Sequence, residues 1–178
     1  MRIVQINSDY NTGSTGRIVE GIASAARRRG HDTRAVYGRK IQPGPTKTYR
    51  VSAWADQAFH GIYSLLADAH GLGSTAATRR LIGFLEEINP DVIGLHNLHG
   101  YYLNTPILFD YLHRTQLPVL WTLHDCWAFT GHCSYFDRFD CRKWQTECYD
   151  CPMTSYYPRS LVDRSTRNHR WKKRVFSG

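Results

Sequence analysis

The chain has 178 residues, of which 42% are hydrophobic and 21% are charged, and its formal net charge is +8. This length suits one well-buried core and is too short for two comfortable ones, so we expect a single domain. The amino terminus has no apolar leader with a small-residue cleavage site, and no apolar run approaches the ~20 residues of a membrane span. We therefore expect a cytoplasmic protein.

The first 30 residues predict a strand, a glycine-containing loop and a helix. Residues 3–6 form an apolar run, and residues 9–16 are polar and include two glycines. Apolar residues then recur at helical spacing over 18–26, and this pattern ends in arginines followed by Gly30.

The chain up to residue 123 continues to alternate predicted strands and helices. Such alternation is typical of an α/β fold whose parallel sheet is covered by helices on both faces. We predict strands at 33–37, 91–95 and 118–123, the last of them buried, a further short strand at 50–53, and helices at 53–67, 74–88 and 105–114.

Polar residues gather where the predicted strands end. They occupy 7–16, 96–102 and 124–125, and ligands of open parallel sheets bind outside the carboxyl ends of the strands. Neutral imidazoles at His96, His99 and His124 would suit contacts to sugar hydroxyls or a phosphate. Any single loop histidine is more often structural, and the aromatic neighbours Tyr101, Tyr102 and Trp127 are either packing residues or platforms for a sugar ring.

The loop Gly13-Ser14-Thr15-Gly16 opens a predicted helix, where backbone amides can approach an anion closely. Two glycines are equally consistent with a tight turn. The spacing is not G-x-G-x-x-G, and the second strand ends in Gly38-Arg39 instead of the acid that holds a nicotinamide ribose. These residues therefore exclude a dehydrogenase, and the missing G-K-[ST] excludes a P-loop.

Four cysteines lie within 19 residues at Cys133, Cys141, Cys148 and Cys151, and the last two form a C-x-x-C pair. In a reducing compartment such a cluster favours a metal site over disulfides. We expect a structural zinc in an excursion over 126–152, because that segment is too polar and aromatic to form a core. Free thiols and a redox pair are the alternatives. His132 is a reserve ligand, and Cys126 is expected to be a buried thiol.

The tail over 159–176 is strongly basic, with seven Lys or Arg against one acid over 159–174. We predict a helix over 160–176 that also carries Trp171 and Phe176. Most such charge runs are solvated faces, but a cationic helix with these aromatics could also rest on an anionic membrane surface.

Several strings together resemble the amino-terminal domain of bacterial family-4 glycosyltransferases, in particular those that build colanic-acid-like and other exopolysaccharides. The opening strand is followed by GSTGR, residues 89–102 read NPDVIGLHNLHGYY, residues 122–133 read TLHDCWAFTGHC, and a C-x-x-C-P ends at Pro152. The resemblance covers essentially the whole chain.

The resemblance implies a retaining, metal-independent enzyme with two Rossmann-like domains (GT-B) that moves a hexose from a nucleotide-sugar to a lipid-linked or saccharide acceptor. His124 and Asp125 would lie beside the reacting sugar. Gly13, Ser14, Thr15, Gly16 and Arg17 would lie near the donor phosphates and the acceptor, and His96, Asn97, His99, Tyr101 and Tyr102 would line the acceptor side.

One departure from that family concerns its carboxyl-terminal domain, which grips the nucleotide through an E-x7-E motif. The 178 residues do not include it, so we expect them to form the acceptor-side half of an active site and to be inactive in isolation. A zinc-containing nucleic-acid-binding module that uses the basic tail is an alternative, although we expect no nucleic acid partner. A catalytically silent interaction domain is another.

Overall fold

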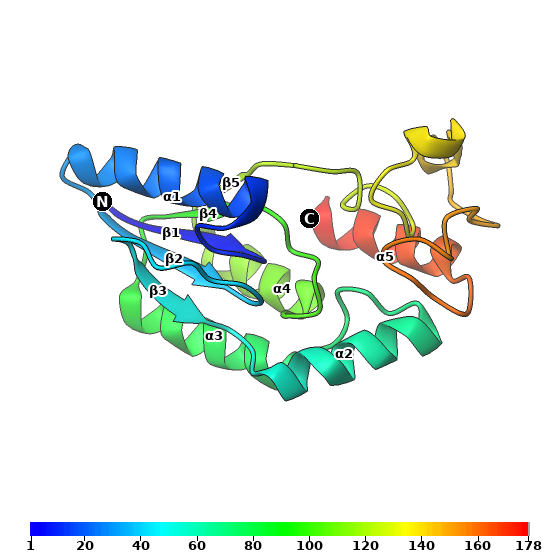
Figure 1. Ribbon diagram of the computed structural model, residues 1–178, viewed down its shortest axis with the longest axis horizontal. Coiled ribbons are helices and arrows are strands. Elements are labelled where there is room, and N and C mark those ends of the chain that lie inside the picture. The colour runs from blue at the N-terminus through cyan, green and yellow to red at the C-terminus, as the bar shows by residue number, and fades with distance from the viewer. Residues whose placement is uncertain (178) are drawn as a thin grey trace.

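The sheet has five strands in the order β3-β2-β1-β4-β5 (Figure 1). Every neighbouring pair is parallel, which confirms the predicted α/β class. The computed structural model describes residues 1–177. The strands are β1 (Arg2–Asn7), β2 (Asp32–Tyr37), β3 (Lys47–Arg50), β4 (Val92–Leu95) and β5 (Val119–Trp121).

Helices cover both faces of the sheet, as the alternation predicts. In Figure 1, α1 lies over one face, and α3 and α4 lie on the opposite side. The α-helices are α1 (Gly13–Arg28), α2 (Trp54–Ala67), α3 (Thr75–Ile88), α4 (Thr105–Thr115) and α5 (Ser165–Phe176). Among the described residues, no helix has both the length and the apolar character needed to cross a membrane.

The main core lies between the sheet and the helices α3 and α4. Val4 and Ile93 from the central strands are fully buried with Leu81 and Leu85 of α3 and Leu108 of α4. Burying each such side chain contributes about 1.5–3 kcal/mol. This core fixes the strands, and with them the loops at their carboxyl ends.

Two predicted strands differ in the structure. The strand expected at 50–53 forms earlier, at Lys47–Arg50. The strand expected to be buried at 118–123 is the short edge strand β5, whose Leu120 is 70% exposed. Among the described strands β5 pairs only with β4, so its other edge is unpaired.

The basic tail forms a shorter helix than expected, because residues 160–164 are not helical and α5 begins at Ser165. Its aromatic residues face inward. Trp171 is buried, and the ring of Phe176 packs against Phe109 and Trp121 at centroid distances of 4.7 and 4.8 Å. The suggestion that Trp171 and Phe176 contact a membrane is therefore wrong, since both contribute to the core.

The excursion over 126–152 contains no strand among its residues and only two short 3-10 helices, at Asp137–Phe139 and Lys143–Gln145. It lies beyond the carboxyl ends of the strands, on the side where α5 packs (Figure 1). It therefore adjoins the predicted binding rim.

Candidate functional site at the carboxyl ends of the strands

Asn7, at the end of β1, joins two of the three predicted rim segments. Its side-chain Oδ1 accepts from the backbone N–H of Asn97 (3.1 Å), and its Nδ2 donates to the carbonyl of Asp9 (2.7 Å) and to Oγ1 of Thr15 (3.2 Å). The side chain is fully buried. The glycine loop and the segment after β4 are therefore held together by one amide.

His96 and His124 form a hydrogen-bonded chain with Gln5. Nε2 of His96 lies 2.7 Å from Oε1 of Gln5, and Nδ1 of His96 lies 2.9 Å from Nε2 of His124. Because an amide oxygen only accepts, His96 carries its proton on Nε2 and accepts from His124 on Nδ1. His124 therefore carries its proton on Nε2, and its Nδ1 keeps a lone pair that can accept a hydrogen bond.

Both imidazoles in this chain are kept neutral. Burial, followed by the nearby His124, lowers the pKa of His96 to about 4. Burial also lowers the pKa of His124, with the charge of Asp125 opposing it. Neither side chain is then protonated at neutral pH, so the order of donors and acceptors is fixed.

His99 and Asp125 form a second pair beside the first. Nε2 of His99 lies 2.5 Å from Oδ2 of Asp125, and its Nδ1 lies 3.1 Å from the hydroxyl of Tyr157. Oδ1 of Asp125 accepts from the backbone N–H of Trp127 (2.9 Å). Burial alone would raise the pKa of Asp125, but the hydrogen bond and charge of His99 outweigh it and lower that pKa.

The two pairs adjoin one small cavity. His96, Asn97, His99, His124, Asp125 and Trp127 are among its lining residues. The predicted convergence of the segments after β4 and β5 is therefore observed.

The rim residues differ in how freely they can meet a ligand. His96 and His99 are buried, and both nitrogens of each ring are engaged within the protein. Both oxygens of Asp125 are also engaged, which makes it an orienting group for His99. His124 is only half-buried, and it is the member of the two pairs best placed to touch a ligand.

Tyr102 does not line the acceptor side as predicted. It is fully buried, its hydroxyl donates to the carbonyl of Asn97 (2.8 Å), and its ring packs against Gly38. The prediction of a ligand contact is wrong for this residue, which supports the rim from below. Tyr101 and Asn97 are half-buried and remain candidates for contact.

The glycine loop is the first turn of α1. Gly13 has φ +64, and a side chain on Gly16 would press against the backbone of Asp9 and Asn11 at 3.1 Å. No side chain caps this helix, because Thr12 makes no capping hydrogen bond. Ser14 and Arg17 are exposed and Thr15 is half-buried. An uncapped amino terminus of this kind can receive an anion through its backbone amides.

Sequence reasoning missed several residues of the rim. Gln5 orients His96, and Tyr157 bonds His99. Arg39, just past β2, approaches Gly100, and its charge opposes the burial that raises the pKa of Tyr101. His70 is buried under the rim and accepts from the backbone N–H of Gly100 at 3.2 Å. Only Arg39 carried a readable signal, as a cation directly after a predicted strand.

The predicted zinc ligands Cys133, Cys141, Cys148 and Cys151 are all free thiols that line one narrow cavity. A hydrogen bond from Cys151 lowers the pKa of Cys133 to about 6. Within residues 1–177, no three His, Cys, Asp or Glu side chains are already arranged as ligands around one metal position. Cys126 is half-buried, with a pKa raised by burial.

Comparison with known proteins points to carbohydrate chemistry. No protein-family model matches the chain. A segment of 92 residues is 34% identical to an Escherichia coli (strain K12) protein named "Putative colanic acid biosynthesis glycosyl transferase WcaC". The match covers 49% of this chain and 22% of that protein. The chain is therefore similar to part of a protein named as a glycosyltransferase, and it spans less than a quarter of that relative's length.

Proposed function

We propose that this chain is the acceptor-side half of a glycosyltransferase that contributes to the synthesis of a cell-surface polysaccharide. The observation that carries the proposal is the paired His96–His124 and His99–Asp125 arrangement at the carboxyl ends of β4 and β5. The similarity to WcaC supports the same assignment. The reaction would move a hexose from a nucleotide-sugar, with retention of configuration, in a two-domain GT-B enzyme.

His124 would act on the reacting sugars. Its Nδ1 lone pair, left free by the chain from Gln5 through His96, can accept a hydrogen bond from a sugar hydroxyl. Fixing an acceptor in place before the reaction avoids reorganisation when charge develops. Asp125 would position His99 and Tyr157, and it would not itself touch the sugars.

The amino terminus of α1 would lie near the donor phosphates. Its uncapped amides and the guanidinium groups of Arg17 and Arg39 surround the same rim with positive charge. Most of the nucleotide contacts would come from the second domain of such enzymes. We therefore expect this chain to bind nucleotide-sugars weakly and saccharide acceptors at the rim.

The test is calorimetry of the full chain with uridine and guanosine diphosphate sugars and with oligosaccharide acceptors, combined with the histidine side-chain NMR spectrum. We expect acceptors to shift the imidazole signals of His124 and to leave those of the distant His31 unchanged. Micromolar binding of a nucleotide-sugar, with no acceptor shifting the imidazole signals of His124, would contradict the assignment of the rim to the acceptor.

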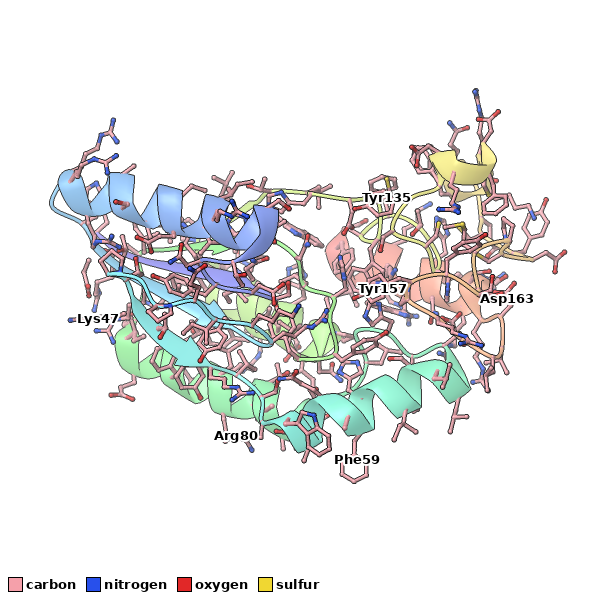
Figure 2. The ribbon with its side chains drawn as sticks, in the orientation of Figure 1. Lys47, Phe59, Arg80, Tyr135, Tyr157 and Asp163 are labelled. Atoms are coloured by element: carbon pink, nitrogen blue, oxygen red, sulfur yellow. The ribbon has the colours of Figure 1, made fainter. Side chains whose placement is uncertain are left out.

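The helix α2 carries an exposed apolar surface, which is relevant to how a lipid-linked acceptor would reach the protein. Phe59, Ile62, Tyr63 and Leu66 fall on one outward face of this helix, and Trp54 in its first turn is 78% exposed. Figure 2 shows Phe59 pointing away from the body of the protein. Leu161 and Val162, exposed beside the last turn of α2, extend the surface. Such a cluster on one helix marks an interaction site.

The charges around α2 favour an anionic membrane as the partner of this surface. Asp56 is the one acid of the helix and is paired with Arg80 at 3.5 Å. Arg167 donates to the carbonyl of Ala67 (3.4 Å) at the other end. We therefore propose that α2, and not the basic tail, holds the protein at the inner face of the membrane, where a lipid-linked acceptor would be presented.

Vesicle sedimentation tests this contact. Phe59→Ser with Leu66→Ser should weaken binding to phosphatidylglycerol vesicles about tenfold or more. Ile18→Ser with Ile22→Ser is the matched control, because both isoleucines are exposed on α1. Equal loss in both variants would contradict the proposal. So would light scattering that showed a dimer of the unmodified chain that the α2 variant does not form.

A second candidate function, binding of a nucleic acid, rests on one observation. Arg164, Arg167, Arg170 and Arg174 line an open pocket together with Tyr149 of the excursion, so the basic tail and the cysteine segment share a face. Asp150 and Asp163 line the same pocket and reduce its positive potential. Salt-sensitive binding of single-stranded RNA, lost in Arg167→Gln with Arg170→Gln, would favour this candidate.

A further inference from the structure

The four cysteines of the excursion come together from separate turns of an irregular segment. Cys133 and Cys151 line one narrow cavity. Sγ of Cys148 accepts from the backbone N–H of Gly131 at 3.1 Å. Cys141 lines the same cavity as these three. Four thiols thus line one narrow cavity although strands and α-helices do not organise the residues between them.

The surroundings of this cavity contain polar atoms that lack partners. Nε2 of His132, Oγ of Ser134 and Nε1 of Trp144 are buried without a hydrogen bond. His132 is nevertheless well oriented, because its Nδ1 lies 2.6 Å from Oδ1 of the buried Asp68. Buried polar groups are normally satisfied, and a local group of exceptions points to a bound ion or water.

We propose that Cys133, Cys141, Cys148 and Cys151 bind one structural zinc ion as thiolates. Zinc suits four sulfur ligands in a tetrahedral arrangement, and a C-x-x-C pair supplies two of them from one turn. Each thiol releases its proton on binding, so no oxidant or reductant is required. Small rotations of side chains that already line one cavity would complete the ligand set.

The same metal would fix α5 and the rim. The backbone N–H of Cys151 donates to Asp163 (2.7 Å), and Oγ1 of Thr166 donates to the carbonyl of Cys148 (2.7 Å), so the C-x-x-C turn is attached to the start of α5. At the other end, Cys126 lies two residues beyond His124. Its backbone N–H donates to the carbonyl of Ser134 (2.9 Å). Loss of zinc would therefore loosen the segment that follows Asp125.

Elemental analysis and X-ray absorption of the full chain test the site. We expect about one zinc per chain after dialysis, with four sulfur neighbours at roughly 2.3 Å. Chelation should lower Tm by more than about 10 °C. Cys148→Ser should lose the metal, and Cys126→Ser, the matched control in the same segment, should keep it. The absorption spectrum of the unmodified chain decides the ligand set even if Cys148→Ser fails to fold.

Three results would overturn the proposal. The first is metal-free protein that is fully folded, and the second is a disulfide between Cys133 and Cys151 in freshly purified protein. The third is a metal that Cys141→Ser retains and His132→Ala loses, which would replace the four-thiolate set by three thiolates and an imidazole.

Discussion

The sheet body and the excursion hold their shapes by different means. In the body, parallel strands and a buried apolar core fix each residue through many contacts. In the excursion, order comes from aromatic pairs such as Phe129–Trp144, with ring centroids 4.9 Å apart, and from hydrogen bonds to α5.

The rim lies where these two regions meet. His96 follows a core strand, whereas Asp125 directly precedes the irregular segment. The geometry of the site thus depends on both. The difference between the regions shows that a site on a rigid sheet can still depend on a segment without regular structure.

Within the sheet body, the largest effect is expected from overpacking at Gly38. A Cβ there would lie 2.1 Å from Cγ of Tyr102, so Gly38→Ala must displace the ring that supports the rim. We expect a loss of about 2–3 kcal/mol in the free energy of unfolding and a Tm lower by about 5–10 °C. Gly61→Ala on α2, where a Cβ meets nothing within 4 Å, is the control and should not destabilise. Equal melting temperatures for the two variants would contradict the packing described.

A comparable loss of stability is expected on acidification, because of the buried histidines of the sheet body. The pKa of His60 and of His96 is lowered to about 4, mainly by burial. Because the folded state holds them neutral, the unfolded state binds more protons below pH 6.5. Their stabilisation is complete above about pH 6.5 and is lost toward pH 4, at about 1.4 kcal/mol per pH unit for each group.

Urea unfolding of zinc-saturated protein at pH 7 and pH 5.5 measures this slope. The same measurement on His96→Gln gives a reference. The difference between the two pH dependences removes the contributions to stability that both proteins share, including that of the metal. The variant should lose less stability on acidification than the unmodified chain. An identical pH dependence in both would mean that His96 is not held neutral.

A smaller, local effect is expected from Gly131 in the excursion. A Cβ there would lie 2.3 Å from the carbonyl oxygen of Ser165 and 2.6 Å from Cβ of Cys148. Gly131→Ala should cost about 1–2 kcal/mol and should separate the excursion from α5. Hydrogen exchange should accelerate at Cys126 and Thr130 and stay unchanged at Ile93 of β4. Uniform acceleration would show that the two regions unfold as one unit.

The sequence predicted the elements well where periodicity determines them. The alternation of strands and helices gave the sheet, and polar residues after strands located the rim. It could not show that Gln5 reaches His96 across 91 residues, or that Tyr157 reaches His99 across 58. The first contact depends on strand order, the second depends on how irregular chain returns to the rim, and periodicity contains neither.

Two misreadings have a common physical cause. They are the membrane contact of the basic tail and the burial of the strand at 118–123, and both arise because an apolar pattern does not say whether the fold covers it. The structure buries Trp171 of α5 and exposes Phe59 of α2. In the same way β5 has an apolar sequence and lies at an exposed edge. Burial is decided by tertiary packing, so these assignments required coordinates.

The most direct test of the proposed site is His124→Ala in a form of the protein that has transferase activity. Turnover and Tm are measured on the same preparation. His124 is half-buried at the rim and keeps one nitrogen free. The account predicts a loss of about 10²–10³ in turnover, because one preorganised hydrogen-bonding group is removed, with Tm little changed. A large fall in Tm with near-normal turnover would contradict it and would assign His124 to the support of the excursion.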